Sequence, residues 1–138
     1  MTTTTDARAD FLAEPIELVQ SFWDRLEQRT LLVNYVDDCD LFQHQPETFC
    51  SACGSDDVEW RDTPGLGEVH SFIAVDQGYY HTFTDLIPYN VFIIQLNEGP
   101  RLGSNLIGID SHDVEIEMRV KATPQPVGDR FALFFEKA

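Results

Sequence analysis

The chain has 138 residues, 43% of them hydrophobic, and 24 acidic against 9 basic side chains give it a net charge of −15. This length suits one ordinary domain with a small appendage and can bury a core. Proteins bind polyanions chiefly by neutralising phosphates with Lys and Arg, so the charge argues against a nucleic-acid partner. The N-terminus lacks the features of a signal peptide, and no apolar run approaches the ~20 residues that span a bilayer. We therefore expect a soluble, cytoplasmic protein with no membrane partner.

The N-terminal part is predicted to be a disordered tail over 1–10 followed by an amphipathic helix over 11–29. Pro15 suits the first turn of a helix because its φ is restricted. Apolar side chains then recur at helical spacing: Ile16, Val19, Phe22, Trp23 and Leu26. The two aromatic rings can pack against the chain's own domain. Alternatively, Phe22 and Trp23 form an interface with a partner subunit, since exposed aromatic patches often mark interfaces.

All the cysteines of the chain lie in one short segment, which we predict to be a rubredoxin-like zinc ribbon over 30–57. An odd number of clustered cysteines suits a reducing compartment and a metal better than a disulfide framework. Cys50 and Cys53 form one Cys-x-x-Cys pair, but the residue that should pair with Cys39 is Val36, which cannot bind a metal. The expected cofactor is therefore zinc held by three cysteines, with one ligand missing.

The missing fourth ligand leaves two interpretations open. His44 lies between the two halves of the ribbon and is the best substitute, with a water molecule as the alternative, because imidazole is an ordinary zinc ligand. Asp37, Asp38 and Asp40 are poorer candidates. The other interpretation is a ribbon without metal, held by hairpin hydrogen bonds and by the packing of Phe42 and Phe49.

After the ribbon, the hydrophobic pattern changes from a helical period to the alternation of β-strands. Branched and aromatic residues are concentrated in six segments, over 58–63, 67–76, 89–97, 100–109, 117–123 and 130–136. Asn97-Glu98-Gly99-Pro100 predicts a tight hairpin between two of them. Five or six short strands suggest a small closed barrel, so we predict an OB-fold domain over 58–138 and a mostly β protein.

An aromatic-rich connection, GYYHTFTDLIP, runs from 78 to 88. Its rings can cap one mouth of the barrel or line a substrate site, as loops on rigid scaffolds often do. The candidate substrate-lining residues are Phe72, Tyr79, Tyr80, His81 and Phe83. We predict no catalytic residue, because the hydroxyls, imidazoles and thiols of the chain have no spacing typical of a nucleophile and its base.

The order of elements resembles a known family. The segments SFWDRLEQRTLLVNYVDDC, PETFCSACGSDDVEW, GLGEVHSFIAV and DLIPYNVFIIQLNEGPRLGSNLIG are similar to accessory proteins that combine an N-terminal helix, a rubredoxin-like zinc ribbon and an acyl-CoA-associated OB fold. The resemblance covers roughly 21–136. It implies an accessory subunit of a thiolase-like enzyme that cleaves or forms carbon–carbon bonds of coenzyme A thioesters. The chemistry implied is thiolysis or Claisen condensation, or retro-aldol cleavage of, for example, a steroid side-chain thioester.

The sequence departs from that family at two positions and leaves other functions open. Val36 stands where the first ribbon cysteine is expected, and Glu117 stands where a glycine is usual. Basic residues are few after the ribbon, so phosphate capture from an acyl-CoA is expected to fall to the partner. The alternative functions are a single-stranded nucleic-acid-binding OB module, which the charge disfavours, and a small iron protein that carries electrons, which three cysteines disfavour.

Overall fold

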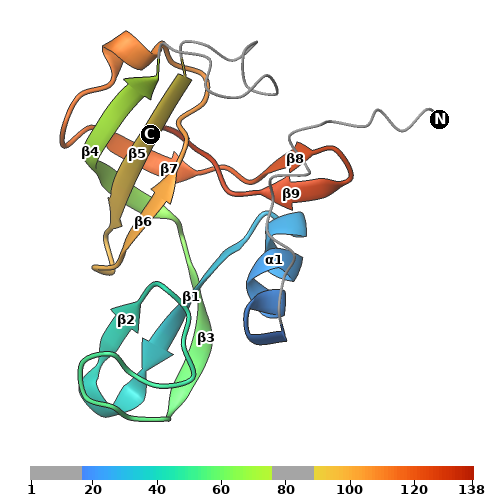
Figure 1. Cartoon of the computed structure of the whole chain (residues 1–138), viewed down its shortest axis with the longest axis vertical. Coiled ribbons are helices and arrows are strands. Elements are labelled where there is room, and N and C mark those ends of the chain that lie inside the picture. Colours follow the sequence, from blue (N-terminus) through green and yellow to red (C-terminus); the bar gives the residue numbers. More distant parts are fainter. Residues whose placement is uncertain (1–16, 76–88) are drawn as a thin grey trace.

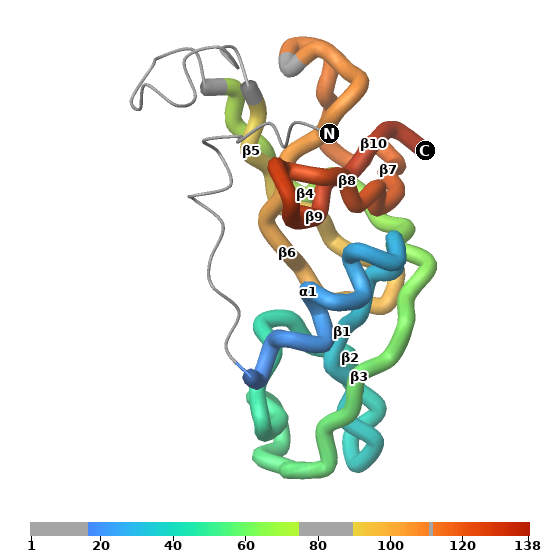
Figure 2. Tube along the Cα trace, turned by 90° about the vertical axis from the view of Figure 1, so that its right-hand side faces the viewer, coloured from blue at the N-terminus to red at the C-terminus, as the bar shows by residue number. Residues whose placement is uncertain are grey.

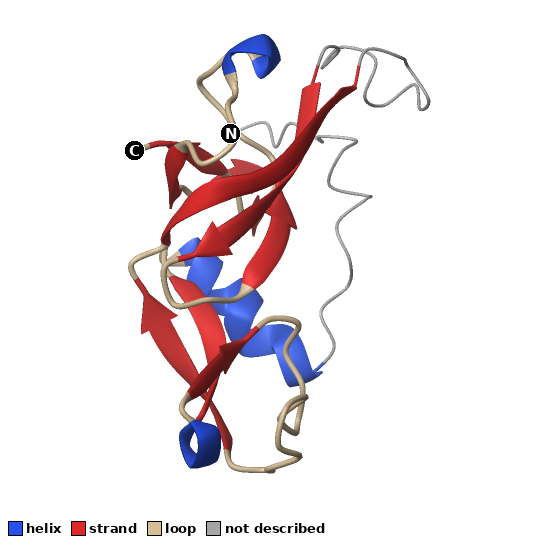
Figure 3. Cartoon of the chain, turned by 90° about the vertical axis from the view of Figure 1, so that its left-hand side faces the viewer, coloured by secondary structure: helices blue, strands red, loops and turns tan. Residues whose placement is uncertain are grey.

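A computed structural model describes residues 17–75 and 89–138 (Figure 1). The described chain forms two β-lobes with one helix packed alongside them (Figures 1 and 3). The tail over 1–10 and the start of the predicted helix lie outside the described residues, as does the whole aromatic connection over 78–88.

The helix of the structure lies inside the predicted range. A 3-10 turn, η2 (Glu17–Val19), leads into α1 (Gln20–Glu27). Arg29 then adopts a positive φ of 59°, which a helix cannot continue through. Leu26 is fully buried on the inner face of α1, so packing rather than intrinsic propensity stabilises this short helix.

The first sheet has the strand order β2-β1-β3 and contains β1 (Leu31–Val36), β2 (Leu41–Gln43) and β3 (Val58–Thr63). A 3-10 turn, η3 (Asp37–Cys39), joins β1 to β2. The sequence pattern predicts the 58–63 strand as part of the barrel, but β3 pairs instead with β1 of the first sheet, from Leu31↔Thr63 to Val36↔Val58. All of β1 is buried, so it needs a strand on each edge to satisfy its backbone groups.

The second sheet has the order β10-β7-β4-β5-β6. Its strands are β4 (Leu66–Val75), β5 (Tyr89–Leu96), β6 (Arg101–Ser104), β7 (Arg119–Ala122) and β10 (Phe135–Lys137). The predicted hairpin after β5 is present, since Gly99 N–H donates to the Leu96 carbonyl. The chain passes from the first lobe to the second between β3 and β4 (green in Figure 2).

The barrel is closed by the segment that follows β6. Leu106 forms a parallel bridge with Phe135 of β10, and the Phe135 N–H donates to the Asn105 carbonyl at 3.0 Å. The two outer strands of the sheet are thereby joined. Five strands closed in this way form the OB-type barrel predicted from the sequence. The 3-10 turn η5 (Ser111–Asp113) lies between β6 and β7.

A β-bulge in β4 determines which side chains enter the barrel. The register shifts between Val69 and Ser71, which leaves His70 unpaired and exposed. Val69 before the bulge is fully buried, and Phe72 after it packs against the core cluster. Ile73 consequently faces outward, with 61% of its surface exposed.

The predicted strand over 130–136 is two strands with different partners. β9 (Arg130–Ala132) pairs with β8 (Gln125–Val127) in a separate hairpin, and only β10 joins the barrel. β8 has no counterpart among the predicted strands: it contains Pro126 and follows Pro124, and proline weakens the strand signal. The β8–β9 hairpin lies beside α1 (Figure 1), where the Phe131 ring meets the Arg29 guanidinium. In the described part of the chain, no helix has the length and apolar character needed to cross a membrane.

Candidate metal centre

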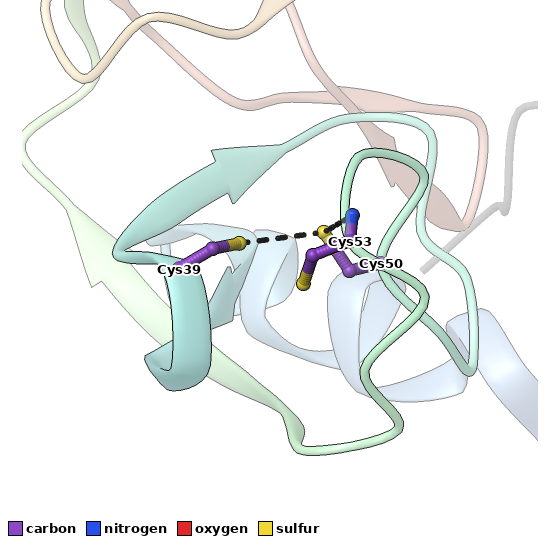
Figure 4. A group of neighbouring side chains, drawn as sticks. All are labelled: Cys39, Cys50 and Cys53. Carbon is purple, nitrogen blue, oxygen red and sulfur yellow. Dashed lines mark hydrogen bonds between the residues drawn. The ribbon is translucent and has the colours of Figure 1, made fainter.

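Three thiols from two separate turns meet in the first lobe (Figure 4). Cys39 comes from η3, and Cys50 and Cys53 come from the loop between β2 and β3. Their sulfur atoms all lie within 4.8 Å of one another, and the Sγ atoms of Cys39 and Cys50 are 3.5 Å apart. Tetrahedral zinc with Zn–S distances of ~2.3 Å separates its sulfurs by roughly 3.8 Å. The spacing therefore fits a metal held by all three cysteines.

Two backbone amides stabilise the thiolate form of Cys50, which is the form that binds a metal. The Cys50 Sγ accepts hydrogen bonds from the Cys53 and Ala52 N–H groups, each at 3.4 Å. These amides, the Cys53 N–H foremost, lower the pKa of the Cys50 thiol to about 7. The hydrogen bond with the Cys53 side chain, followed by burial, raises the pKa of the Cys39 thiol to about 12. Three adjacent thiolates would repel one another, and a dication removes that repulsion.

The loop that carries Cys50 and Cys53 is also held by buried polar side chains. Gln43 donates to the Phe49 carbonyl at 3.1 Å and accepts from the Ser51 N–H at 3.2 Å. The Glu47 N–H donates to the buried side chain of Asn34 at 2.9 Å. These hydrogen bonds are independent of any metal, so part of the ribbon's shape rests on the protein alone.

The structure does not bring His44 to the sulfurs. Its imidazole faces the Phe22 ring, with the ring centroids 6.2 Å apart, and burial lowers its pKa. His44 does not belong to the sulfur group found among the described residues. Phe42 packs against Tyr35 at 4.8 Å between centroids, as the metal-free interpretation required, whereas Phe49 remains 50% exposed.

Phe22 and Trp23, the aromatic residues of α1 that were proposed as a partner interface, contact other residues of the same chain. Phe22 packs against the hydrophobic core and meets the edge of Trp23 at 5.8 Å between centroids. The Arg130 guanidinium covers Trp23 at 5.0 Å from its centroid. Both rings are half-buried. A pocket of about 80 Å³ lies beside Trp23 and is lined by Gln20, Trp23, Asp24, Glu27, Arg130 and Phe131. That volume is too small for an acyl-CoA.

Of the candidate substrate-lining residues, Phe72 alone lies in the part of the chain that the structure describes. Phe72 lies on β4 opposite Phe92 and packs inward, so it contributes to the barrel core. The four others lie outside the described residues: Tyr79, Tyr80, His81 and Phe83. Sequence reasoning missed an exposed apolar patch on the outer face of β4 and β5, formed by Ile73, Val91 and Ile93. The alternation of apolar and polar residues in β4 and β5 could have located this patch. The bulge in β4, however, reverses which residues of that strand face outward.

The fold and the sulfur cluster define a ribbon-and-barrel protein, and family comparisons agree with this class. The family model described as "ChsH2, rubredoxin-like zinc ribbon domain" matches residues 23–59. The model described as "ChsH2, C-terminal OB-fold domain" matches residues 60–125. The chain belongs to the ChsH2 family of proteins that join a rubredoxin-like zinc ribbon to an OB-fold domain.

Individual relatives share this architecture to different extents. The solved structure described as "Ltp2-ChsH2(DUF35) aldolase" is 27% identical, with a TM-score of 0.80 over 91% of this chain and 98% of that chain. A DUF35-family crystal structure of unknown function from Sulfolobus solfataricus is 14% identical, with a TM-score of 0.64 over 95% of this chain and 92% of that one, and supports the fold alone.

A curated relative from Thermomonospora curvata, the "Probable enoyl-CoA hydratase alpha subunit", is 35% identical over 101 residues, which are 72% of this chain. The match spans only 31% of the length of that relative.

Proposed function

We propose that the chain is an accessory, non-catalytic subunit of a thiolase-like enzyme that cleaves carbon–carbon bonds of coenzyme A thioesters by a retro-aldol reaction. One observation carries the proposal: the chain matches 98% of a chain described as part of an Ltp2-ChsH2 aldolase, with a TM-score of 0.80. The relative described as an enoyl-CoA hydratase subunit supports the substrate class, because its name also refers to a coenzyme A thioester.

The described residues support an accessory role rather than an independent catalyst. Acyl-CoA carries several phosphate charges, whereas this chain has a net charge of −15. In the described barrel, the cations Arg119 and Lys121 are paired with Glu68 and Glu136 at 4.0 and 3.4 Å. The partner would therefore bind the phosphates and supply the acid and base groups. This chain would contribute apolar wall near the acyl part, with the residues of the 78–88 connection as candidates.

The proposed retro-aldol cleavage and thiolysis differ in whether free coenzyme A is consumed. In a retro-aldol step, a base removes the proton of the 3-hydroxyl group, the bond between C2 and C3 breaks, and C3 becomes a carbonyl. C2 takes the electron pair and then a proton, which leaves a shortened acyl-CoA. No second thiol is consumed. Thiolysis of a 3-oxoacyl-CoA would instead require free coenzyme A.

The test is reconstitution of the complex with candidate thiolase-like proteins by co-expression and size-exclusion chromatography. We expect a stable heteromer that converts a 3-hydroxyacyl-CoA to a carbonyl product and a shorter acyl-CoA, while this chain alone converts none. Chromatography with mass detection measures both products, with and without added coenzyme A. A chain that binds none of the candidates, or that is equally active alone, would contradict the accessory role. Cleavage of the corresponding 3-oxoacyl-CoA only, and only with added coenzyme A, would identify the reaction as thiolysis instead of a retro-aldol cleavage.

A further inference from the structure

The two turns that carry the cysteines have the same backbone pattern. We call residues 36–40 the first knuckle and residues 50–54 the second knuckle. The first residue of each is buried, with Val36 at 0% and Cys50 at 1% exposure. The fourth residue of each is an exposed cysteine, Cys39 or Cys53. The fifth residue of each is left-handed, with φ of 50° at Asp40 and 75° at Gly54.

This correspondence identifies the position of the missing ligand. In the second knuckle, both the buried first residue and the exposed fourth residue point a sulfur toward the cluster (Figure 4). In the first knuckle, only the fourth residue does so, because the first is a valine at the end of β1. The first knuckle therefore has the backbone pattern of the second, with a valine at the position of the buried ligand.

Neighbouring side chains do not replace that ligand. The Asp38 carboxylate accepts a hydrogen bond from the Ser55 hydroxyl, and the Asp40 carboxylate accepts one from the Tyr35 hydroxyl. His44 packs against the Phe22 ring. Within residues 17–75 and 89–138, the group of metal-ligating side chains at this place contains the three cysteines and no fourth donor.

We propose that zinc is held by three thiolates only, that the fourth donor is a solvent molecule, and that residue 36 occupies the position that corresponds to the buried ligand Cys50. A structural zinc site normally has four protein ligands. The ion should therefore exchange with chelators more readily than in a four-cysteine ribbon. Replacing Val36 by cysteine should complete the set, because the knuckle backbone that presents such a ligand is already in place.

Competition with a chromogenic chelator, under reducing conditions, compares zinc affinity in the wild type and in the Val36→Cys variant. We expect Val36→Cys to bind zinc on the order of 10-fold tighter or more, since even partners outside the ligand shell change affinity 10- to 100-fold. The matched control is Val69→Cys, which adds a thiol at an equally buried valine in the barrel. Affinity of Val36→Cys equal to that of Val69→Cys would overturn the assignment of residue 36.

Cobalt substitution provides a second measurement that does not depend on how Val36→Cys folds. The visible spectrum of cobalt reports the number of thiolate ligands and the coordination geometry. We expect His44→Ala to leave the spectrum of the wild-type complex and its zinc affinity unchanged. A spectral change, or a zinc loss as large as that of Cys50→Ser, would make His44 the fourth ligand and overturn the proposal. A wild type that binds no metal under reducing conditions would overturn it as well.

Discussion

At the scale of single residues, the backbone of Glu117 is unusual. Its φ of 67° is left-handed, and its N–H donates to the Val69 carbonyl of β4 at 2.8 Å. A non-glycine residue in this region costs roughly 1–2 kcal/mol. The family resemblance led us to expect a glycine here, and the conformation gives the physical reason. The hydrogen bond to β4 holds the turn in this conformation despite the strain.

We predict that Glu117→Gly raises the free energy of unfolding by a few tenths to about 1 kcal/mol. Relief of the left-handed strain exceeds the entropy that glycine adds to the unfolded chain, which is about 0.5–1 kcal/mol. Urea unfolding at constant zinc measures the change. The matched control is Glu115→Gly, an exposed position with no positive φ, which should lower the unfolding free energy. Equal destabilisation by both substitutions would mean that the strain at Glu117 is negligible.

Residue types predicted the sulfurs of the site but not the surroundings of His44. Cys50 and Cys53 were expected to meet because the spacing of a Cys-x-x-Cys pair constrains the local turn, and Cys39 was expected to join them because it lies in the same short segment. His44 lies in a connection whose path depends on the buried amides of Asn34 and Gln43. Those contacts join residues 6 and 13 positions apart, and the spacing of the ligands does not reveal them. Spacing alone therefore could not predict that His44 packs against Phe22.

At the scale of elements, the Asn90 side chain binds the segment after β6 that closes the barrel against β10. We call this junction the β6–β10 seam. Asn90 of β5 accepts from the Leu106 N–H at 2.7 Å and donates to the Leu106 carbonyl at 3.2 Å. Leu106 is the residue that bridges to Phe135 of β10. Asn90 is 5% exposed, so both of its hydrogen bonds are shielded from water. The Asn90 side chain thus pairs both backbone groups of Leu106, in addition to the backbone hydrogen bonds between this segment and Phe135.

We predict that Asn90→Leu lowers the free energy of unfolding by about 1–3 kcal/mol, because it leaves buried backbone groups of Leu106 without partners. Urea unfolding measures this loss, and hydrogen exchange should show faster exchange of amides along the β6–β10 seam. Asn97→Leu is the control, since Asn97 is exposed and its bond to Arg119 lies at the surface. It should change stability by no more than about 0.5 kcal/mol. Similar losses from both variants would contradict the role of Asn90.

Strand positions were more predictable than strand partners. Alternation of apolar and polar residues located β3, β4 and β5 with nearly correct ends. It could not assign β3 to the first sheet, because the pairing with β1 depends on burial of β1 on both faces. It also missed the β8–β9 hairpin, in which Pro124 and Pro126 weaken the strand signal.

At the scale of the whole molecule, polar contacts join the two lobes. Thr63 at the end of β3 donates to Glu98 in the hairpin after β5 and accepts from the Gly65 N–H at 3.0 Å. Arg25 of α1 forms an ion pair with Asp62 of β3 at 3.0 Å. The ion pair is largely exposed and contributes little to stability. The Thr63 contacts lie where β3 leads into β4, so they constrain how the ribbon is placed on the barrel.

The proposed function requires a surface that a partner subunit can cover. On the outer face of the barrel, Ile73 lies opposite Val91, and Ile93 follows on the same face of β5. Their exposed fractions are 61%, 40% and 36%. Contiguous exposed apolar side chains commonly mark protein interfaces. Trp23 on α1 is the other candidate, but it is partly covered by Arg130 of the same chain.

We predict that Ile73→Ser weakens association with the thiolase-like partner about tenfold or more, because an exposed isoleucine buried by a partner loses its apolar contacts. Titration calorimetry measures the affinity, and thermal unfolding of the free chain confirms that each variant is folded. Ile116→Ser is the matched control, since Ile116 is 55% exposed in the segment between η5 and β7, does not belong to the patch of Ile73, Val91 and Ile93, and should leave affinity unchanged. Trp23→Ala should lower the stability of the free chain more than its affinity for the partner, because its ring packs against the chain itself. If Ile73→Ser binds like the wild type while a folded Trp23→Ala does not bind, the partner docks on α1 and not on the barrel face.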